Sequence, residues 1–167
     1  MKNTFAVLFT LAFVHIVSAQ DWVDVSLDKK TTLSFSSKPE VTNSGNKKIY
    51  QLITENYLMN TVVADLSGNP NFKITSNDLD QFYEGIIKGS LNAAKDAKVL
   101  SKKNIKNNNF QGRQIIYTKD FNGIDDLQIT KQIYLVGKKV IIIEFWKFTE
   151  SDVSSIASKF FNSFKTL

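Results

Sequence analysis

The sequence contains no cysteine and a single histidine, His15, which lies within the first 19 residues. Disulfide bonds and thiol chemistry are therefore excluded. After residue 19 the chain also lacks the histidine that Ser-His-Asp and Cys-His catalysis require, and it lacks the usual ligands of zinc and copper. We therefore expect a protein that is not an enzyme and that holds no metal and no cofactor.

The excess of positive charge is small, and arginine is scarce. The chain has 21 Lys and Arg residues against 16 Asp and Glu, and Arg113 is its only arginine. No glycine-rich phosphate loop is present, and the aromatic residues do not alternate with lysines as they do on nucleic-acid-binding surfaces. We expect no nucleic-acid partner. The segment 99–105, with lysines in and around it, is interpreted as an exposed edge strand, and a docking surface for an acidic partner is the alternative.

The first 19 residues have the composition of a secretory signal peptide. A basic start, Met1-Lys-Asn, precedes about thirteen mostly apolar residues, and Val17-Ser18-Ala19 offers small residues for cleavage. This run is shorter than the roughly twenty residues that a membrane-spanning helix needs, although a retained N-terminal anchor is the alternative. We expect residues 1–19 to be removed, and residues 20–167 to form one globular domain that is exported to the periplasm or beyond and does not span a membrane.

Two turn signals divide the second half of the chain into extended segments. Asn122-Gly123 suits a hairpin turn with positive φ at both positions, and Gly137-Lys138 suits the turn that requires glycine first. The strand that follows, residues 139–148, is apolar on both faces. Such a strand must be covered from both sides, which predicts a layered fold with this strand at its centre.

The first half of the chain contains two predicted hairpins and then a helix. The hairpins cover residues 21–35 and 48–66, with a loop at residues 42–48 between them. A helix follows after a cap at Ser76 or Asn77. Its expected apolar stripe consists of Leu79, Phe82, Ile86, Ala93 and Ala97. Gly85 and Gly89 in this helix indicate close packing against the sheet.

A second helix is predicted at the end of the chain. Thr149 begins it, and Asp152 three residues later approximates a capping box. Its apolar stripe consists of Val153, Ile156, Ala157, Phe160 and Phe164. Because hairpin turns make the sheet mainly antiparallel, the fold class is α+β. We expect an α/β/α sandwich with one helix on each face of a central sheet, and a fold with both helices on one face is the alternative.

The order of these features resembles a known fold. The resemblance rests on three short motifs, Phe35-Ser-Ser-Lys-Pro39, Gly112-Arg113 and Phe160-Phe-Asn-Ser-Phe164, together with the long helix between the strand groups. It is similar to the fold of the photosystem II extrinsic protein PsbP and the Ran-binding protein Mog1, with their bacterial secreted relatives. The resemblance implies an α/β/α sandwich and a binding or assembly role, and it supplies no catalytic residues.

Glu144 is the residue most at odds with its surroundings. It lies between Ile142 and Trp146 on an otherwise apolar strand face. A buried carboxylate needs a partner or its pKa rises. We expect Glu144 to pair with a lysine or with Arg113, or to lie near the sheet edge; a functional carboxylate that faces a pocket is the alternative. Arg113 itself is a candidate for binding an anion.

Three functions remain open from the sequence. The first is an exported, non-catalytic binding or accessory protein with an unknown protein partner. The second is a carrier of an apolar small molecule, held between sheet and helix by residues such as Tyr83, Trp146 and Phe148; an enclosed cavity would favour it. The third is a hydrolase with two carboxylates, and pairing of Glu144 with a cation would argue against it. Its candidate carboxylates are Glu55, Asp65, Glu84 and Glu144.

Overall fold

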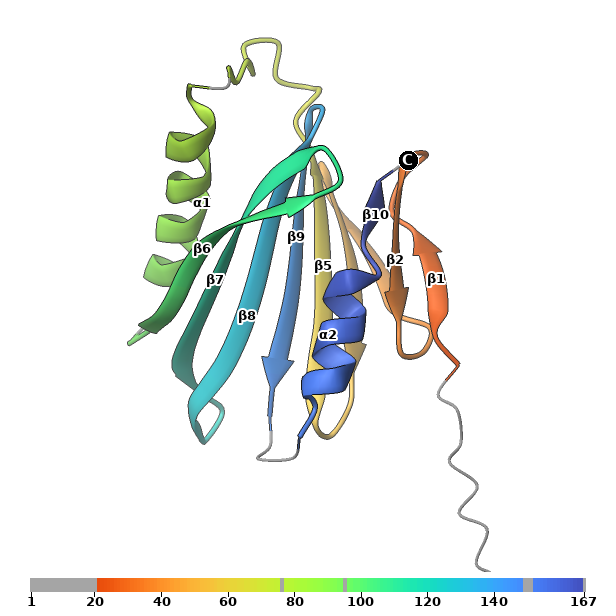
Figure 1. Ribbon diagram of the computed structural model, residues 1–167, viewed down its shortest axis with the longest axis vertical. Coiled ribbons are helices and arrows are strands. Elements are labelled where there is room, and N and C mark those ends of the chain that lie inside the picture. Colours follow the sequence, from red (N-terminus) through yellow and green to blue (C-terminus); the bar gives the residue numbers. More distant parts are fainter. Residues whose placement is uncertain (1–20, 76, 95, 149–151, 167) are drawn as a thin grey trace, which may run out of the picture.

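The computed structural model describes residues 21–75, 77–94, 96–148 and 152–166. Within these residues, two helices and ten strands form three layers around a large central sheet (Figure 1). None of the helices in these ranges is long and apolar enough to cross a bilayer.

Seven antiparallel strands make up the central sheet. They are β3 (Glu40–Ser44), β4 (Lys47–Ile53), β5 (Tyr57–Asp65), β6 (Lys98–Asn107), β7 (Phe110–Phe121), β8 (Ile124–Val136) and β9 (Lys139–Lys147). Their spatial order is β3-β4-β5-β9-β8-β7-β6. The strand that is apolar on both faces is β9, and it occupies the middle of the sheet as predicted. Ile141 and Ile143 are fully buried on one face of β9, and Val140 is buried on the other.

The two helices lie on opposite faces of this sheet (Figure 1). Helix α1 (Leu79–Ala93) covers one face, and helix α2 (Ser154–Asn162) covers the other. A small sheet lies beside α2 and is formed by β1 (Val23–Ser26), β2 (Thr31–Phe35) and β10 (Lys165–Thr166). The prediction of an α/β/α sandwich around a mainly antiparallel sheet is confirmed.

The stripe predicted for α1 is confirmed in part, because Leu79, Phe82, Ile86 and Ala97 are partly buried and pack against the core. Tyr83 and Ile87 are the buried residues of α1, whereas Ala93 is exposed. Tyr83 lies outside the predicted stripe, although it was a candidate for a site between sheet and helix, and its hydroxyl finds backbone partners in the interior. Gly85 and Gly89 are exposed, and a Cβ atom at either position would meet nothing within 4 Å. The prediction that these glycines pack against the sheet is therefore wrong.

Both helix starts also differ from the predictions. For α1 the N-cap residue is Asp78, one or two positions later than predicted, and its carboxylate accepts hydrogen bonds from Thr75. The predicted start of α2 at Thr149 lies outside the described residues. Helix α2 begins at Ser154, whose backbone N–H donates to the Asp152 carboxylate at 2.9 Å.

Two strands were not predicted. The expected loop at residues 42–48 instead contains the end of β3, its turn and the start of β4, and every residue of β3 is exposed. Strand β10 has only two residues. At the other edge of the sheet, the lysine-rich β6 is the edge strand that the sequence predicted. An exposed edge strand carries no apolar alternation, so its sequence resembles a loop.

Candidate functional site

The register of the sheet aligns side chains across the face that α1 covers. One row contains Gln51, Asn60, Glu144, Lys131 and Ile115. A second row contains Ile53, Leu58, Trp146, Ile129 and Tyr117. A third row contains Ile49, Val62, Ile142, Ile133 and Arg113. The first row is polar at its centre, and the second is apolar along its length.

Glu144 is buried, with 8% of its surface exposed, and three donors hold its carboxylate. Lys131 Nζ lies 2.8 Å from one oxygen. The other oxygen accepts hydrogen bonds from Asn60 Nδ2 at 3.0 Å and from Trp146 Nε1 at 3.4 Å. Lys131 also donates to Ser90 in α1 at 2.8 Å, so the ion pair fastens the helix to the sheet. Glu144 thus pairs with a lysine as expected, and its carboxylate is occupied rather than free for proton transfer.

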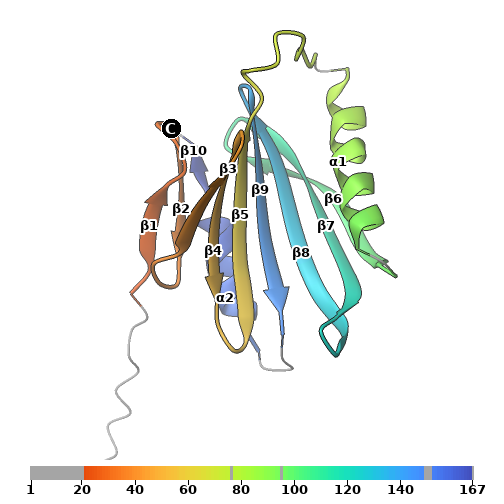
Figure 2. The same cartoon turned by 180° about the vertical axis from the view of Figure 1, so that it is seen from behind.

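Helix α1 covers only half of this sheet face. Tyr117 and Ile129 are buried beneath it, Trp146 is half-buried, and Ile53 at the far end of the row is 61% exposed. We call the half without a helix over it the open face, and it consists of Ile49, Ile53, Leu58, Val62, Ile142 and Trp146, from β4, β5 and β9. Ile53 is exposed, Leu58 is buried, and the other four are half-buried. Figure 2 shows these three strands with no helix in front of them, and α1 to one side.

Contacts to β6, β7 and β8 explain why α1 lies to one side. Arg113 in β7 forms an ion pair with Asp80, and Lys102 in β6 forms one with Glu84 at 2.9 Å. The hydroxyl of Tyr83 donates to the Gln111 carbonyl at 2.7 Å and accepts from the Leu135 N–H at 3.1 Å. These contacts hold α1 over one half of the sheet and leave the other half without a helix over it.

A groove of about 590 Å³ lies on the open face. Its apolar lining consists of Ile53, Leu58, Phe121, Ile124, Trp146 and Phe148. Phe121 is 37% exposed and meets Trp146 edge-on, with ring centroids 5.5 Å apart. The groove therefore presents aromatic surface to solvent.

A lysine and an amide add polar features near the groove. Lys119 Nζ lies 4.5 Å from the Trp146 ring centroid and 4.7 Å from that of Phe121, within cation–π range. Burial lowers the pKa of Lys119, the Glu144 carboxylate opposes this shift, and Lys131 adds to it. Asn60 also lines the groove, and its side-chain oxygen is buried without a hydrogen-bond partner.

The four predicted site residues separate into two places. Glu144 and Trp146 lie at the open face, joined by a hydrogen bond. Tyr83 of α1 and Arg113 of β7 lie between that helix and the sheet, where both are buried and the guanidinium is 5.3 Å from the tyrosine ring centroid. Burial raises the pKa of Tyr83, and this outweighs the lowering by the Leu135 N–H and by Arg113. The predicted pocket that joins Tyr83 to Trp146 and Phe148 is therefore divided, and only the latter two line the groove.

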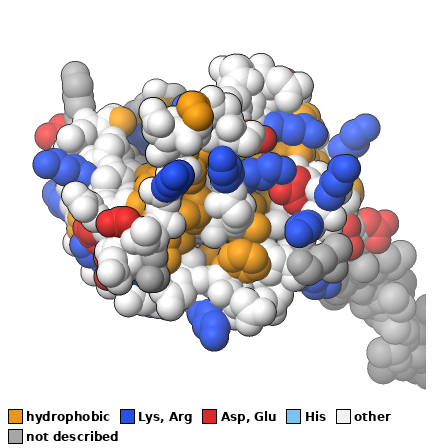
Figure 3. All heavy atoms as spheres, turned by 90° about the horizontal axis from the view of Figure 1, so that it is seen from above, with side chains coloured by type: hydrophobic (Ala, Val, Ile, Leu, Met, Phe, Trp, Pro, Cys, Tyr) orange, Lys and Arg blue, Asp and Glu red, His pale blue; other side chains and the backbone are white. Residues whose placement is uncertain are grey.

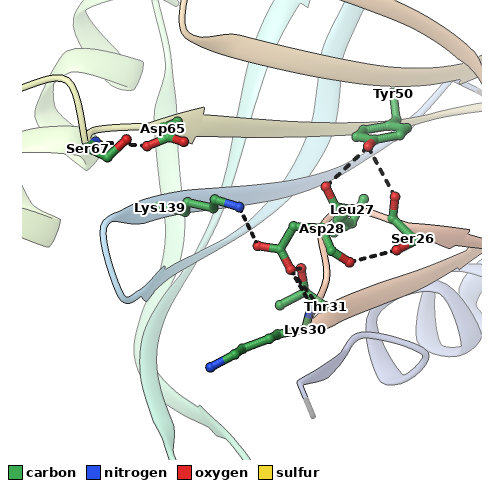
Figure 4. Close-up of polar contacts among 9 residues, drawn as sticks. All are labelled: Ser26, Leu27, Asp28, Lys30, Thr31, Tyr50, Asp65, Ser67 and Lys139. Carbon is green, nitrogen blue, oxygen red and sulfur yellow. Dashed lines mark hydrogen bonds and ion pairs between the residues drawn. The ribbon is translucent and has the colours of Figure 1, made fainter.

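One charged region was missed by the sequence reasoning. At one end of the molecule, Asp28 in the β1–β2 turn forms an ion pair of 2.8 Å with Lys139 at the start of β9 (Figure 4). Burial raises the pKa of Asp28, but hydrogen bonds from Lys139, Lys30 and Thr31 outweigh it and lower the pKa to about 2. In the sequence, two adjacent lysines mark each of three separate turns. Only the fold brings these three turns together.

Comparisons with known proteins identify the fold and no more. No family model matches the sequence, and no curated protein matches it. The structure is similar to cyanobacterial PsbP from Synechocystis, with a TM-score of 0.59 and 11% identity over 94% of this chain and 99% of that one. It is also similar to the Ran-binding protein Mog1p of Saccharomyces cerevisiae, with a TM-score of 0.50 and 10% identity over 89% of this chain and 96% of that one. The chain has a PsbP/Mog1-like fold, as its motifs predicted.

Proposed function

We propose that this chain is an exported, non-catalytic binding or accessory protein that engages a protein partner through the open face. The observation that carries the proposal is an apolar sheet half that α1 leaves uncovered. Contiguous exposed apolar surface on a folded protein commonly marks an interaction site. Trp146 supplies the aromatic anchor that binding hot spots favour, and Lys119 supplies a charged rim.

The shape of the groove favours a protein over a small molecule. Small-molecule sites enclose most of the surface of their ligand. Here Ile53 and Phe121, which line the groove, remain exposed to solvent. A partner that lies across three strands would cover both residues at once. Mog1p, which has the same fold, is by name a Ran-binding protein and so binds another protein.

Two observations support the non-catalytic part of the proposal. Beyond residue 19 the sequence has no histidine or cysteine to act as nucleophile or base. Glu144, the most unusual carboxylate, is held by Lys131 and two further donors. A carboxylate in that arrangement stabilises the fold and is not available as a general acid.

Export rests on the sequence of residues 1–19 and has its own test. The intact mass and N-terminal sequence of the protein isolated from its source are expected to show a chain that begins at Gln20 or Asp21. A protein that retains Met1 in the cell would contradict export and would leave the binding proposal to be judged by itself.

The binding proposal is tested with variants of the mature chain, residues 20–167. Immobilised wild-type protein, Ile53→Asp and Leu100→Asp are each exposed to extract from the cell envelope and medium. Leu100 is the matched control, because it is 59% exposed on β6 and lies outside the open face. A partner retained by wild type and Leu100→Asp but lost by Ile53→Asp supports the proposal. Equal retention by all three proteins would refute it.

A carrier of an apolar small molecule is the second candidate function. The apolar lining of the groove of about 590 Å³ favours it, because Leu58, Trp146 and Phe148 could contact an apolar ligand. Native mass spectrometry of protein purified from its source is expected to show one bound molecule of fixed mass. That molecule should be lost from Trp146→Ala and kept by Leu100→Asp.

A further inference from the structure

A second surface lies at the end of the molecule where three hairpin turns meet, and we call it the basic end. It is defined by three lysine pairs, Lys29-Lys30, Lys47-Lys48 and Lys138-Lys139. Backbone hydrogen bonds of 2.8 Å join Asp65 to the β3–β4 turn and Leu66 to the β8–β9 turn. Figure 3, which views this end, shows lysine side chains around an apolar centre. The basic end is therefore one continuous surface built from separate turns.

Most of the positive charge at this end is not neutralised. The residues that line its two clefts include six lysines and two aspartates. Asp28 is occupied by Lys139, and the other five lysines are exposed and make no ion pair within the described part of the chain. The second aspartate, Asp65, accepts a hydrogen bond from the Ser67 N–H at 2.8 Å. The clefts are thus rimmed by free ammonium groups.

The shape of the basic end indicates the kind of ligand. Its clefts measure about 830 and 710 Å³ and share Asp65, Ser67 and Lys139 in their linings. Leu27, Val63 and Leu66 give one cleft an apolar lining, and Phe110 and Val136 do so for the other. A ligand that fits both clefts carries apolar groups inside and negative charges at the rim.

We propose that the basic end binds a peptide segment of a partner protein in which acidic and apolar residues are interspersed. A bilayer is flat and would contact protruding side chains, whereas these apolar side chains line concave clefts. Because lysine is a point charge rather than a bidentate donor, binding is of moderate strength and weakens as salt is added. This surface is separate from the open face, and the inference does not depend on the function proposed above.

The test uses a fluorescent peptide of alternating glutamate and leucine, titrated with the mature chain at low and high ionic strength. Lys30→Glu/Lys138→Glu removes charge from the basic end. Lys38→Glu/Lys88→Glu is the matched control, because it makes the same change in net charge on exposed residues that line neither cleft. Circular dichroism confirms that both variants fold. Vesicles that contain phosphatidylserine are the competing probe.

We expect wild type and the control variant to bind the peptide alike, and Lys30→Glu/Lys138→Glu to bind about tenfold or more weakly. Peptide binding should fall at high ionic strength and should be unchanged in Ile53→Asp, which tests the open face only. Equal weakening in both charge variants would show an effect of net charge and would overturn the proposal. Vesicle binding without peptide binding would overturn it in favour of a membrane surface.

Discussion

Replacing Lys131 with methionine removes the cation that faces Glu144 but keeps most of the side-chain volume. The two side chains are only 8% and 11% exposed, so the remaining carboxylate would stay largely buried with Asn60 and Trp146 as its donors. Breaking a buried pair from one side costs about 3–5 kcal/mol of folding free energy, because an uncompensated charge remains. For a chain of this size that corresponds to a fall in melting temperature of roughly 6–20 °C.

The double variant Lys131→Met/Glu144→Gln separates this effect from simple loss of packing. Glutamine can still accept the hydrogen bond from Asn60, and no charge is buried, so we expect a stability within about 1 kcal/mol of wild type. Urea unfolding of wild type, both single variants and the double variant at neutral pH gives the coupling free energy, which we expect to exceed about 2 kcal/mol.

An exposed ion pair provides the control for this cycle. The side chains of Lys98 and Asp126 are 73% and 64% exposed, so Lys98→Met should change stability by less than about 1 kcal/mol. If the effects at Lys131 and Glu144 were simply additive, the pair would not be a structural unit, and Glu144 would again be open to a role in chemistry.

Three further predictions concern other parts of the fold. Asp28→Asn should lower the free energy of unfolding by about 1–2 kcal/mol at neutral pH, after allowance for solvent screening. Because the folded pKa of Asp28 is lowered from 3.8 to about 2, its contribution is complete above pH 3.8 and is lost as the pH falls through about 2, so urea unfolding should show the variant and wild type converging over that range. Gly89→Ala should raise stability by about 0.5–1 kcal/mol, because the site is an exposed helix interior with free space around a Cβ; an unchanged or lower melting temperature would contradict this. Gly112→Ala should lower stability by about 1–3 kcal/mol, because its Cβ would lie 2.7 Å from the Tyr134 ring and from a backbone oxygen of β8. A melting temperature of the variant equal to that of wild type would contradict this and would show that the strands move apart without cost.

The layering of the fold could be predicted because β9 is apolar on both faces and turn signals flank the strands around it. A strand of that kind must be covered twice, which fixed the helices on opposite faces. Strand β3 could not be predicted in this way, because all its residues are exposed and its pairing with β4 alone determines it. The predicted stripe of α1 did not include Tyr83, which is fully buried because backbone groups at Gln111 and Leu135 satisfy its hydroxyl.

The partner of Glu144 could have been found from the sequence. A two-residue turn at Gly137-Lys138 pairs residues that lie equally far before and after it, and Glu144 and Lys131 are each six positions away. The open face and the basic end could not be found in the same way. The open face depends on the position of α1 over the sheet, and the basic end depends on which turns lie together. Contacts between segments far apart in the chain determine both arrangements.

The central claim is that a partner protein covers the open face. Its most direct test places a photoreactive benzoylphenylalanine at Ile53 or at Leu100 in the mature chain and irradiates each protein in extract from the cell envelope and medium. The account predicts a discrete cross-linked partner from position 53, absent from position 100. Cross-links of equal yield at both positions, or none from position 53 while a bound partner is still recovered, would contradict it.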